Sequence, residues 1–202
     1  MEGILEFLKS AERLHFEKRT VRMSNGENLS VSSHSWMMSI MAMIFAPKLK
    51  TPVDMERVLR LSAAHDLAEA KTRDIPMHEL FNSAEKQDEK HRAEERAMDE
   101  FAELVGSREF PDLWREYEDQ STAEAKFVRM LDKLDVCVQV LFSKTIGYIS
   151  EYDGGIYWKI YFSESYRDQF AIEPELLKFF DEIQTRIKAR IKNENIKLEF
   201  EP

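Results

Sequence analysis

Apolar residues recur at steps of three and four along most of this chain, and this spacing constrains the fold more than any other feature. The clearest example lies near the end of the sequence, at Leu177, Phe180, Ile183, Ile187 and Ile191. No segment shows the strong alternation of apolar and polar residues that is typical of a half-buried strand. The 202 residues include only six glycines and six prolines, so breaks in the chain are few. The sequence therefore predicts an all-α fold.

Local signals place the predicted helices. We expect helices near residues 4–14, 33–47, 83–105 and 111–117, and helices that open near residues 51, 121 and 173. Residues 19–33 are polar and contain Asn25-Gly26, so we expect a loop there. Ser121 and Glu124 have the spacing of a capping box, with Ser121 as the N-cap. Residues 147–170 are aromatic and irregular, and their pattern predicts no element.

The most apolar run extends from Trp36 to Ala46 and is interrupted by Ser39. Spanning a bilayer takes about 20 residues, so this run predicts a core helix and no contact with a membrane. Its residues are apolar on most sides, which favours a central position in the fold. The first residues alternate apolar and charged side chains and do not resemble a secretory signal, so we expect a cytoplasmic protein.

Composition narrows the domain organisation and the possible partners. A length of 202 residues favours one domain, with a core of about residues 1–145 and an extension, 146–202, packing on it. The net charge of −9 argues against a partner that is a nucleic-acid polymer. Cys137 is the only cysteine, so any metal site must use histidines and carboxylates.

Two of the five histidines lie in or beside apolar segments. His34 and His65 are these two, whereas His15, His78 and His91 lie among polar residues and are expected at the surface. His65 is followed by Asp66 and, four residues after the histidine, by Glu69. On a helix these three side chains are neighbours, and burying them is costly unless they serve one another or a cation.

Asp132 is a second polar residue in an apolar helix, and Asp135 follows it by one turn. Two imidazoles and two carboxylates would form a mixed nitrogen and oxygen site for a divalent cation such as Mn, Fe, Co, Ni or Zn. From spacing alone, these side chains could instead be buried polar residues that pair with helix ends. Both interpretations stay open at this point.

The order of these residues resembles the H…HD…D pattern of HD-domain metal-dependent phosphohydrolases, and in particular their 5′-deoxynucleotidase group. The resemblance covers roughly residues 1–145. Six stretches carry it: residues 29–36 (LSVSSHSW), 65–70 (HDLAEA), 72–76 (TRDIP), 89–95 (EKHRAEE), 113–118 (LWREYE) and 124–134 (EAKFVRMLDKL). It implies an HD-domain helical bundle.

The resemblance also implies roles for individual residues. His34, His65, Asp66 and Asp132 would hold one divalent metal ion, which could be Co, Mn, Mg, Fe, Ni or Zn. Two further carboxylates would be catalytic. Glu69 would act as an acid or base beside the metal, and Asp74 would lie near the leaving sugar oxygen. The expected reaction is hydrolysis of a (deoxy)nucleoside 5′-monophosphate to nucleoside and phosphate, and the group is commonly dimeric.

This chain departs from the pattern of the group at three positions. Arg22 stands where the group usually has Trp, Leu29 where it has Glu, and Arg73 where it has Gly. We expect Arg19, Arg22 and Arg73 to contact substrate, because arginine suits bidentate binding of phosphate. Two alternatives remain: an HD-type nucleoside triphosphate triphosphohydrolase, and a non-catalytic regulatory protein that binds nucleotides.

Overall fold

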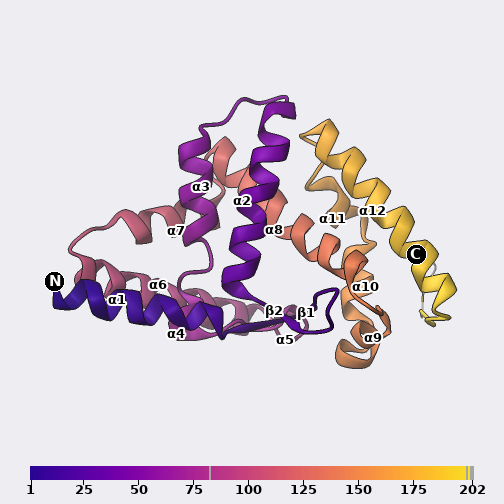
Figure 1. The fold of residues 1–202 in the computed structure, drawn as a ribbon, viewed down its shortest axis with the longest axis horizontal. Coiled ribbons are helices and arrows are strands. Elements are labelled where there is room, and N and C mark those ends of the chain that lie inside the picture. The colour runs from indigo at the N-terminus through magenta and orange to yellow at the C-terminus, as the bar shows by residue number, and fades with distance from the viewer. Residues whose placement is uncertain (82, 199, 201–202) are drawn as a thin grey trace.

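Three helices pack against one another at the centre of the fold: α2 (Val31–Phe45), α3 (Met55–Ala64) and α8 (Ala123–Phe142). Figure 1 shows α2 and α3 side by side, with α8 crossing behind them. This computed structural model describes residues 1–81, 83–198 and 200. The described chain is dominated by helices, which confirms the all-α prediction. Short 3₁₀ turns follow α1 at Arg13–His15 (η1) and α2 at Ala46–Lys48 (η2).

A second group of helices forms around α6 (Ala84–Val105). It packs against α1 (Glu2–Glu12), α4 (Glu69–Thr72) and α7 (Glu109–Asp119). The rings of Phe7 and Phe101 meet edge-on, with 5.2 Å between their centroids. α7 also contacts α3 and α8, so it joins this group to the central helices.

The C-terminal residues form four helices: α9 (Gly147–Asp153), α10 (Ile156–Tyr161), α11 (Glu164–Asp168) and α12 (Pro174–Asn193). α12 packs against α8, and the rings of Phe170 and Phe180 stack at 4.5 Å. The first three helices are short, and Gly154 and Gly155 separate two of them with left-handed backbone. Such short segments carry too few turns for a periodic pattern, which is why residues 147–170 predicted no element.

The prediction of a loop over residues 19–33 is wrong in part. Within these residues β1 (Lys18–Arg22) and β2 (Asn28–Ser30) form an antiparallel hairpin. At the turn Gly26 has a φ of +89°, and the Met23 N–H donates to the Glu27 carbonyl at 2.8 Å. The strands are too short to show an alternating pattern, but the predicted turn at Gly26 is present.

Two further local predictions need correction. Thr122, and not Ser121, is the N-cap of α8, since its hydroxyl accepts from the Ala125 N–H at 3.1 Å. Glu124 does not return to its own helix terminus; its carboxylate accepts from the Asp54 N–H at 2.8 Å. The predicted capping box is therefore replaced by a contact between the start of α3 and the start of α8.

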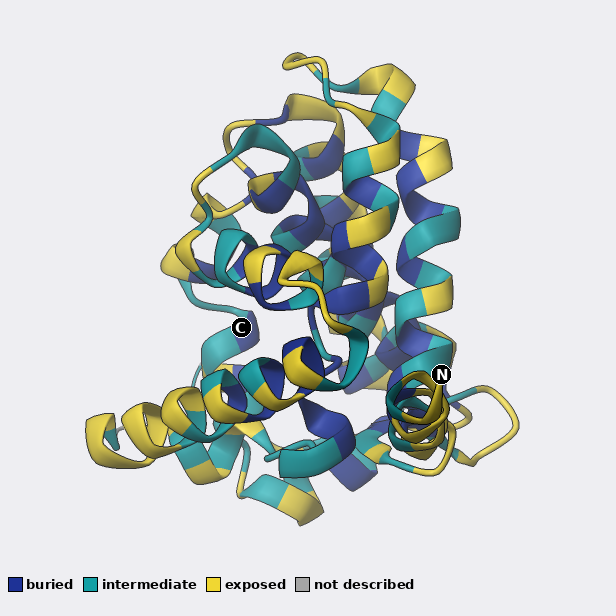
Figure 2. Cartoon of the chain, turned by 90° about the vertical axis from the view of Figure 1, so that its left-hand side faces the viewer, coloured by how far each residue is buried: buried dark blue, intermediate teal, exposed yellow. Residues whose placement is uncertain are grey.

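Helix α2 is central but not buried on all sides. Met38 and Ala42 face the core and are fully buried, whereas Trp36, Met43 and Ile44 are exposed. Figure 2 shows the same alternation of buried and exposed residues along most of the helices. In the described parts of the chain, no helix combines the length and the apolar character needed to span a bilayer.

Candidate metal centre

His34 lies at the end of the first turn of α2 and is completely buried. Its Nδ1 lies 2.7 Å from an oxygen of Asp135, and its Nε2 lies 3.1 Å from an oxygen of Asp132. The two aspartates are one turn apart on α8, so that helix presents both carboxylates to the same ring. Asp135 is fully buried and also accepts from the Gln139 side-chain amide at 3.0 Å.

His65 lies where the third predicted helix breaks. α3 ends at Ala64, and residues 65–68 are turns in which the Glu69 N–H donates to the Asp66 carbonyl at 3.0 Å. Because such i to i+3 bonds place residues three apart on the same side, Asp66 and Glu69 both reach one pocket.

One nitrogen of His65 is buried without a hydrogen-bond partner. The Nδ1–H donates to the Ser62 carbonyl at 3.0 Å, so the lone pair of the neutral ring lies on Nε2. Nε2 lies 3.1 Å from an oxygen of Asp66 but forms no hydrogen bond with any described group. A ring held by a backbone carbonyl, with its second nitrogen free, is how metal-binding histidines are usually oriented.

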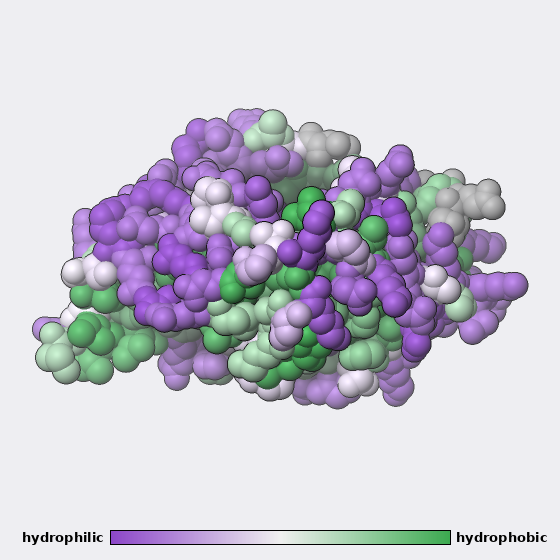
Figure 3. All heavy atoms as spheres, turned by 90° about the horizontal axis from the view of Figure 1, so that it is seen from above, coloured by the Kyte–Doolittle hydropathy of each residue, from purple (hydrophilic) through white to green (hydrophobic). Residues whose placement is uncertain are grey.

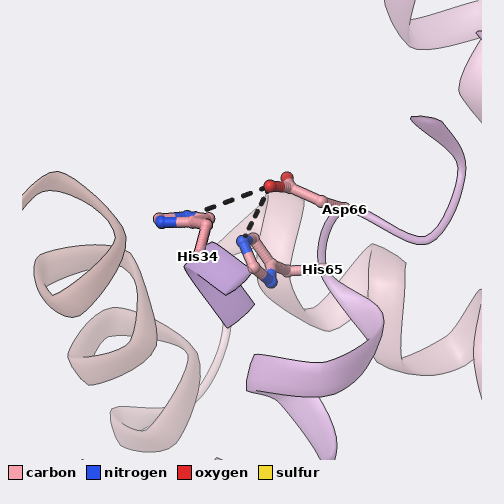
Figure 4. A group of neighbouring side chains, drawn as sticks. All are labelled: His34, His65 and Asp66. Carbon is pink, nitrogen blue, oxygen red and sulfur yellow. Dashed lines mark ion pairs between the residues drawn. The ribbon is translucent and has the colours of Figure 1, made fainter. Parts of the chain in front are cut away.

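His34, His65 and Asp66 converge. Each offers one ligand atom, and these three atoms lie within 4.8 Å of one another. Both rings face the carboxylate of Asp66, as Figure 4 shows. Asp132 lies beside this group through its contact with His34. Two imidazole nitrogens with adjacent carboxylates fit a divalent transition metal ion, and the free lone pair of His65 supports this fit.

A pocket of about 190 Å³ opens onto these residues. We call it the polar pocket, since most of its walls are charged or polar. It is lined by Arg19, His65, Asp66, Glu69, Asp74, Ile75, Met77, Leu80, Lys90, Glu94, Tyr117, Glu118, Arg129 and Asp132. The polar pocket thus brings together three of the predicted metal ligands, His65, Asp66 and Asp132, with both predicted catalytic carboxylates and Arg19.

The guanidinium of Arg19 lies between two carboxylates of the polar pocket. It donates to Asp66 at 2.7 Å and lies 3.7 Å from Asp132. Burial acts to raise the pKa of Asp66, but the opposing effects of His65 and Arg19 are larger in sum. The pKa of Asp66 therefore lies below its ordinary value. Burial also raises the pKa of Asp132, but its hydrogen bond to His34 and the charges of His34 and Arg19 leave the pKa well below the ordinary value. Both carboxylates are therefore held in the ionised form.

Glu69 has the opposite character. Its side chain is buried, and its Oε2 has no hydrogen-bond partner among the described residues. Burial and the negative charges of Asp66 and Asp74 raise its pKa well above the ordinary value. Burial likewise raises the pKa of Asp74, whose backbone N–H donates to Glu17 at 3.1 Å. Neighbouring carboxylates whose pKa values diverge are typical of sites that perform acid–base chemistry.

Two residues without a predicted role complete the environment of Asp132. The hydroxyl of Tyr117 donates to Asp132 at 2.9 Å, and Arg129 donates to that same hydroxyl at 2.9 Å. Arg129 is one turn before Asp132 on α8, so its position could have been inferred from spacing. Tyr117 comes from α7, and no signal in the sequence links it to Asp132.

Arg22 and Arg73, both predicted to contact substrate, do not line the polar pocket. Arg22 stacks over the ring of Tyr148, 4.6 Å from its centroid, and its backbone N–H donates to the Tyr148 hydroxyl. Arg73 is exposed directly before Asp74, with φ +71° and ψ +158°. That backbone region is nearly restricted to glycine, the residue that the resembling group has here. Their contact with substrate stays a prediction.

The three histidines expected at the surface lie outside the metal centre. His15 is exposed and its Nδ1 lies 2.9 Å from the Ser32 hydroxyl. His78 meets the ring of Tyr152 edge-on, and the half-exposed His91 lies 5.1 Å from the ring of Trp114. His34 and His65 are thus the two buried histidines among the described residues, whereas the other three are partly or fully exposed.

Known proteins resemble this chain over about two thirds of its length. A profile of the HD domain matches residues 11–154. The 5′-deoxynucleotidase HDDC2 of Xenopus laevis is 36% identical over 145 residues, which are 69% of this chain and 69% of that protein. The 5′-deoxynucleotidase HDDC2 of Dictyostelium discoideum is 31% identical over 149 residues, 69% of this chain and 76% of the relative.

Solved structures share the fold at lower identity. A protein from Magnetospirillum magnetotacticum, described as a predicted metal-dependent phosphohydrolase, superposes with a TM-score of 0.72 at 22% identity. The superposition covers 94% of this chain and 93% of that protein. The PH0347 protein of Pyrococcus horikoshii gives a TM-score of 0.61 at 23% identity, over 89% and 99% of the two chains. With its profile match and its curated relatives, this chain belongs to the HD-domain family and is related to the 5′-deoxynucleotidases.

Proposed function

We propose that this protein is a metal-dependent phosphohydrolase that cleaves the 5′-phosphate of (deoxy)nucleoside monophosphates. The observation that carries the proposal is the convergence of His34, His65 and Asp66 within 4.8 Å, beside a buried carboxylate that lacks a partner. The curated relatives named 5′-deoxynucleotidase support the substrate class. The products would be a nucleoside and inorganic phosphate.

The metal would be held by His34, His65, Asp66 and Asp132. A divalent ion supplies Lewis acidity toward a phosphoryl oxygen and makes a coordinated water a stronger acid. Asp135 and Ser62 would orient the two imidazoles, and Tyr117 would orient the carboxylate of Asp132. The choice among Co, Mn, Mg, Fe, Ni and Zn depends on availability as well as on ligand type, so a metal screen is part of the test.

The other residues of the polar pocket have proposed roles in handling substrate. Glu69 would accept and return the proton of the attacking water, because its free oxygen faces the pocket beside Asp66. Asp74 would lie near the leaving sugar oxygen and assist its protonation. Arg19 would exchange one of its carboxylate contacts for a phosphate oxygen, which its planar guanidinium suits.

The test is phosphate release from dAMP, dADP and dATP by protein loaded in turn with each candidate ion. The proposal predicts release from dAMP that depends on the ion and exceeds release from the diphosphate and triphosphate. A preference for dATP would contradict this proposal and favour a nucleoside triphosphate triphosphohydrolase. A protein that binds nucleotides tightly but releases no phosphate would favour a non-catalytic regulatory protein. If the positive charges of Arg22 and Arg73 attract substrates with more than one phosphate group, Arg22→Trp should shift the preference further toward dAMP.

We further propose a homodimer in the cytoplasm. Trp36, Met43 and Ile44 form an exposed apolar stripe along one side of α2, with 62%, 56% and 49% of their surface accessible. Figure 3 shows hydrophobic patches among hydrophilic side chains on the face seen from above. A stripe of this kind is typical of an interface between protein chains. Sedimentation of the wild type as a dimer and of Trp36→Lys as a monomer would support this interface; a wild-type monomer would contradict it.

A further inference from the structure

The polar pocket is too small for a whole nucleotide. Its volume is about 190 Å³, whereas sites for small organic ligands usually measure about 300–1,000 Å³. The phosphate and the metal would occupy much of that space. If the proposed function holds, the sugar and the base must extend into a neighbouring cavity, and the walls of the polar pocket indicate which one.

An open groove of about 540 Å³ adjoins the polar pocket at α5 (Met77–Leu80). Met77 and Leu80 line both cavities, so the two are neighbours that share this short helix as a wall. The far wall of the groove comes from α10 and the start of α11, where Ile160, Ser163 and Ser165 lie. We call this cavity the α5 groove.

Two large apolar side chains of the α5 groove are exposed to solvent. Met77 is 46% exposed and Phe81 is 40% exposed. A polarizable thioether and an aromatic ring are suited to the flat face of a nucleobase, and base–aromatic stacking contributes substantially to nucleotide binding. The hydroxyls of Ser163 and Ser165 supply groups that both donate and accept at the edge of the groove.

A third cavity also touches Met77 but fits a base less well. It lies between β1 and α9–α10, and its volume is only about 50 Å³. Tyr148 and Tyr157 are among the side chains that line it. The α5 groove combines sufficient volume and apolar surface with two residues, Met77 and Leu80, that also line the polar pocket.

We infer that the α5 groove binds the nucleoside part of the substrate, with the base against Phe81 and Met77. This inference rests on the proposed function and adds the place where the base is recognised. Since α10 and α11 form one wall, residues beyond the 11–154 match to the HD domain would contribute to substrate binding in this chain. Serine hydroxyls accept as well as donate hydrogen bonds, so they suit the edges of different bases. We therefore expect the groove to discriminate strongly against substrates without a base, and only weakly among bases.

Two variants and two matched controls test the inference. Ser165→Trp places an indole in the groove, whereas Glu164→Trp places one on the same helix outside it. Phe81→Ala removes the aromatic wall, and Phe142→Ala removes another exposed ring, at the end of α8 and outside the groove. The measured quantity is the ratio of kcat/KM for dAMP to kcat/KM for 2-deoxyribose 5-phosphate, which lacks the base.

We expect Ser165→Trp and Phe81→Ala to lower this ratio about tenfold, and both controls to keep the wild-type ratio. Equal ratios for Ser165→Trp and Glu164→Trp would overturn the inference, as would a wild type that hydrolyses both compounds equally well. Calorimetric titration with deoxyadenosine gives an independent readout, and Ser165→Trp should weaken its binding about tenfold. A wild type that releases no phosphate but binds deoxyadenosine would contradict the proposed function alone.

Discussion

The imidazole of His34 is held between two carboxylates of α8, and the shorter contact, 2.7 Å, is to Asp135 and not to the predicted metal ligand Asp132. Asp135 is fully buried and lies behind the ring. A carboxylate in this position fixes the tautomer of a metal-binding histidine and increases its basicity. Asp135 would therefore support the candidate metal centre by orienting His34, although it does not line the polar pocket.

Replacing Asp135 by Asn should weaken metal binding. The variant keeps the shape of the side chain but removes the charge that orients His34, so we expect the dissociation constant for Mn²⁺ to rise about 10- to 100-fold. Isothermal titration calorimetry measures this constant directly. Asp88→Asn, on the exposed side of α6, serves as the control and should bind as the wild type does. An unchanged constant for Asp135→Asn would refute this role.

Replacing Arg73 by Gly should stabilise the protein. Arg73 has φ +71° and ψ +158°, a conformation that costs a side-chain-bearing residue about 1–3 kcal/mol. Glycine relieves this strain but loses more backbone entropy on folding, about 0.5–1 kcal/mol, so the net gain should be about 1 kcal/mol. Urea denaturation measures the free energy of unfolding. Arg73→Ala retains the strain and should show no gain; a Gly variant less stable than the wild type would contradict the prediction.

Cys137 should resist alkylation in the folded protein. Burial raises the pKa of its thiol to about 12, so at pH 8 only about one molecule in ten thousand carries the reactive thiolate. Iodoacetamide at pH 8 should leave the mass of the native protein unchanged and modify Cys137 completely in guanidinium chloride. Rapid modification of the native protein would show that α8 opens at this position far more readily than its packing indicates.

Thr122, as the N-cap of α8, should contribute to stability. Its hydroxyl accepts from the Ala125 N–H, so Thr122→Ala should lower the free energy of unfolding by about 1 kcal/mol. Ser121→Ala is the matched control, because Ser121 does not cap the helix, and its effect should be much smaller. Equal losses for the two variants would restore Ser121 as the cap that the sequence pattern favoured.

The parts of the fold that could be predicted from the sequence are those with several helical turns. Helices α2, α6, α8 and α12 carry enough apolar residues for their period to be recognised. The hairpin at residues 18–30 and the short helices of residues 147–168 do not, since each has few residues and its structure depends on tertiary contacts. The same reason explains the N-cap error, because Glu124 bonds to Asp54, a residue 70 positions away.

The residues of the candidate site that could be predicted are polar side chains that the sequence places in apolar helices. His34, His65, Asp66 and Asp132 stand out because polar groups in apolar helices require partners, and the structure places all four together. Tyr117 was not predictable, since a tyrosine in an amphipathic helix is usually part of the core. Side-chain direction also could not be predicted for Arg22 and Arg73, which lie near the site in sequence but outside its walls.

The proposed catalysis depends most directly on Glu69. The decisive measurement is metal content together with kcat for dAMP, in the wild type and in Glu69→Gln. We predict that both proteins bind one divalent ion per chain and that the variant loses at least about 100-fold in kcat, because only the proton-transferring carboxylate has been removed. Wild-type turnover in a metal-loaded Glu69→Gln protein would contradict this account, and loss of the ion in that variant would make Glu69 a ligand instead of an acid–base residue.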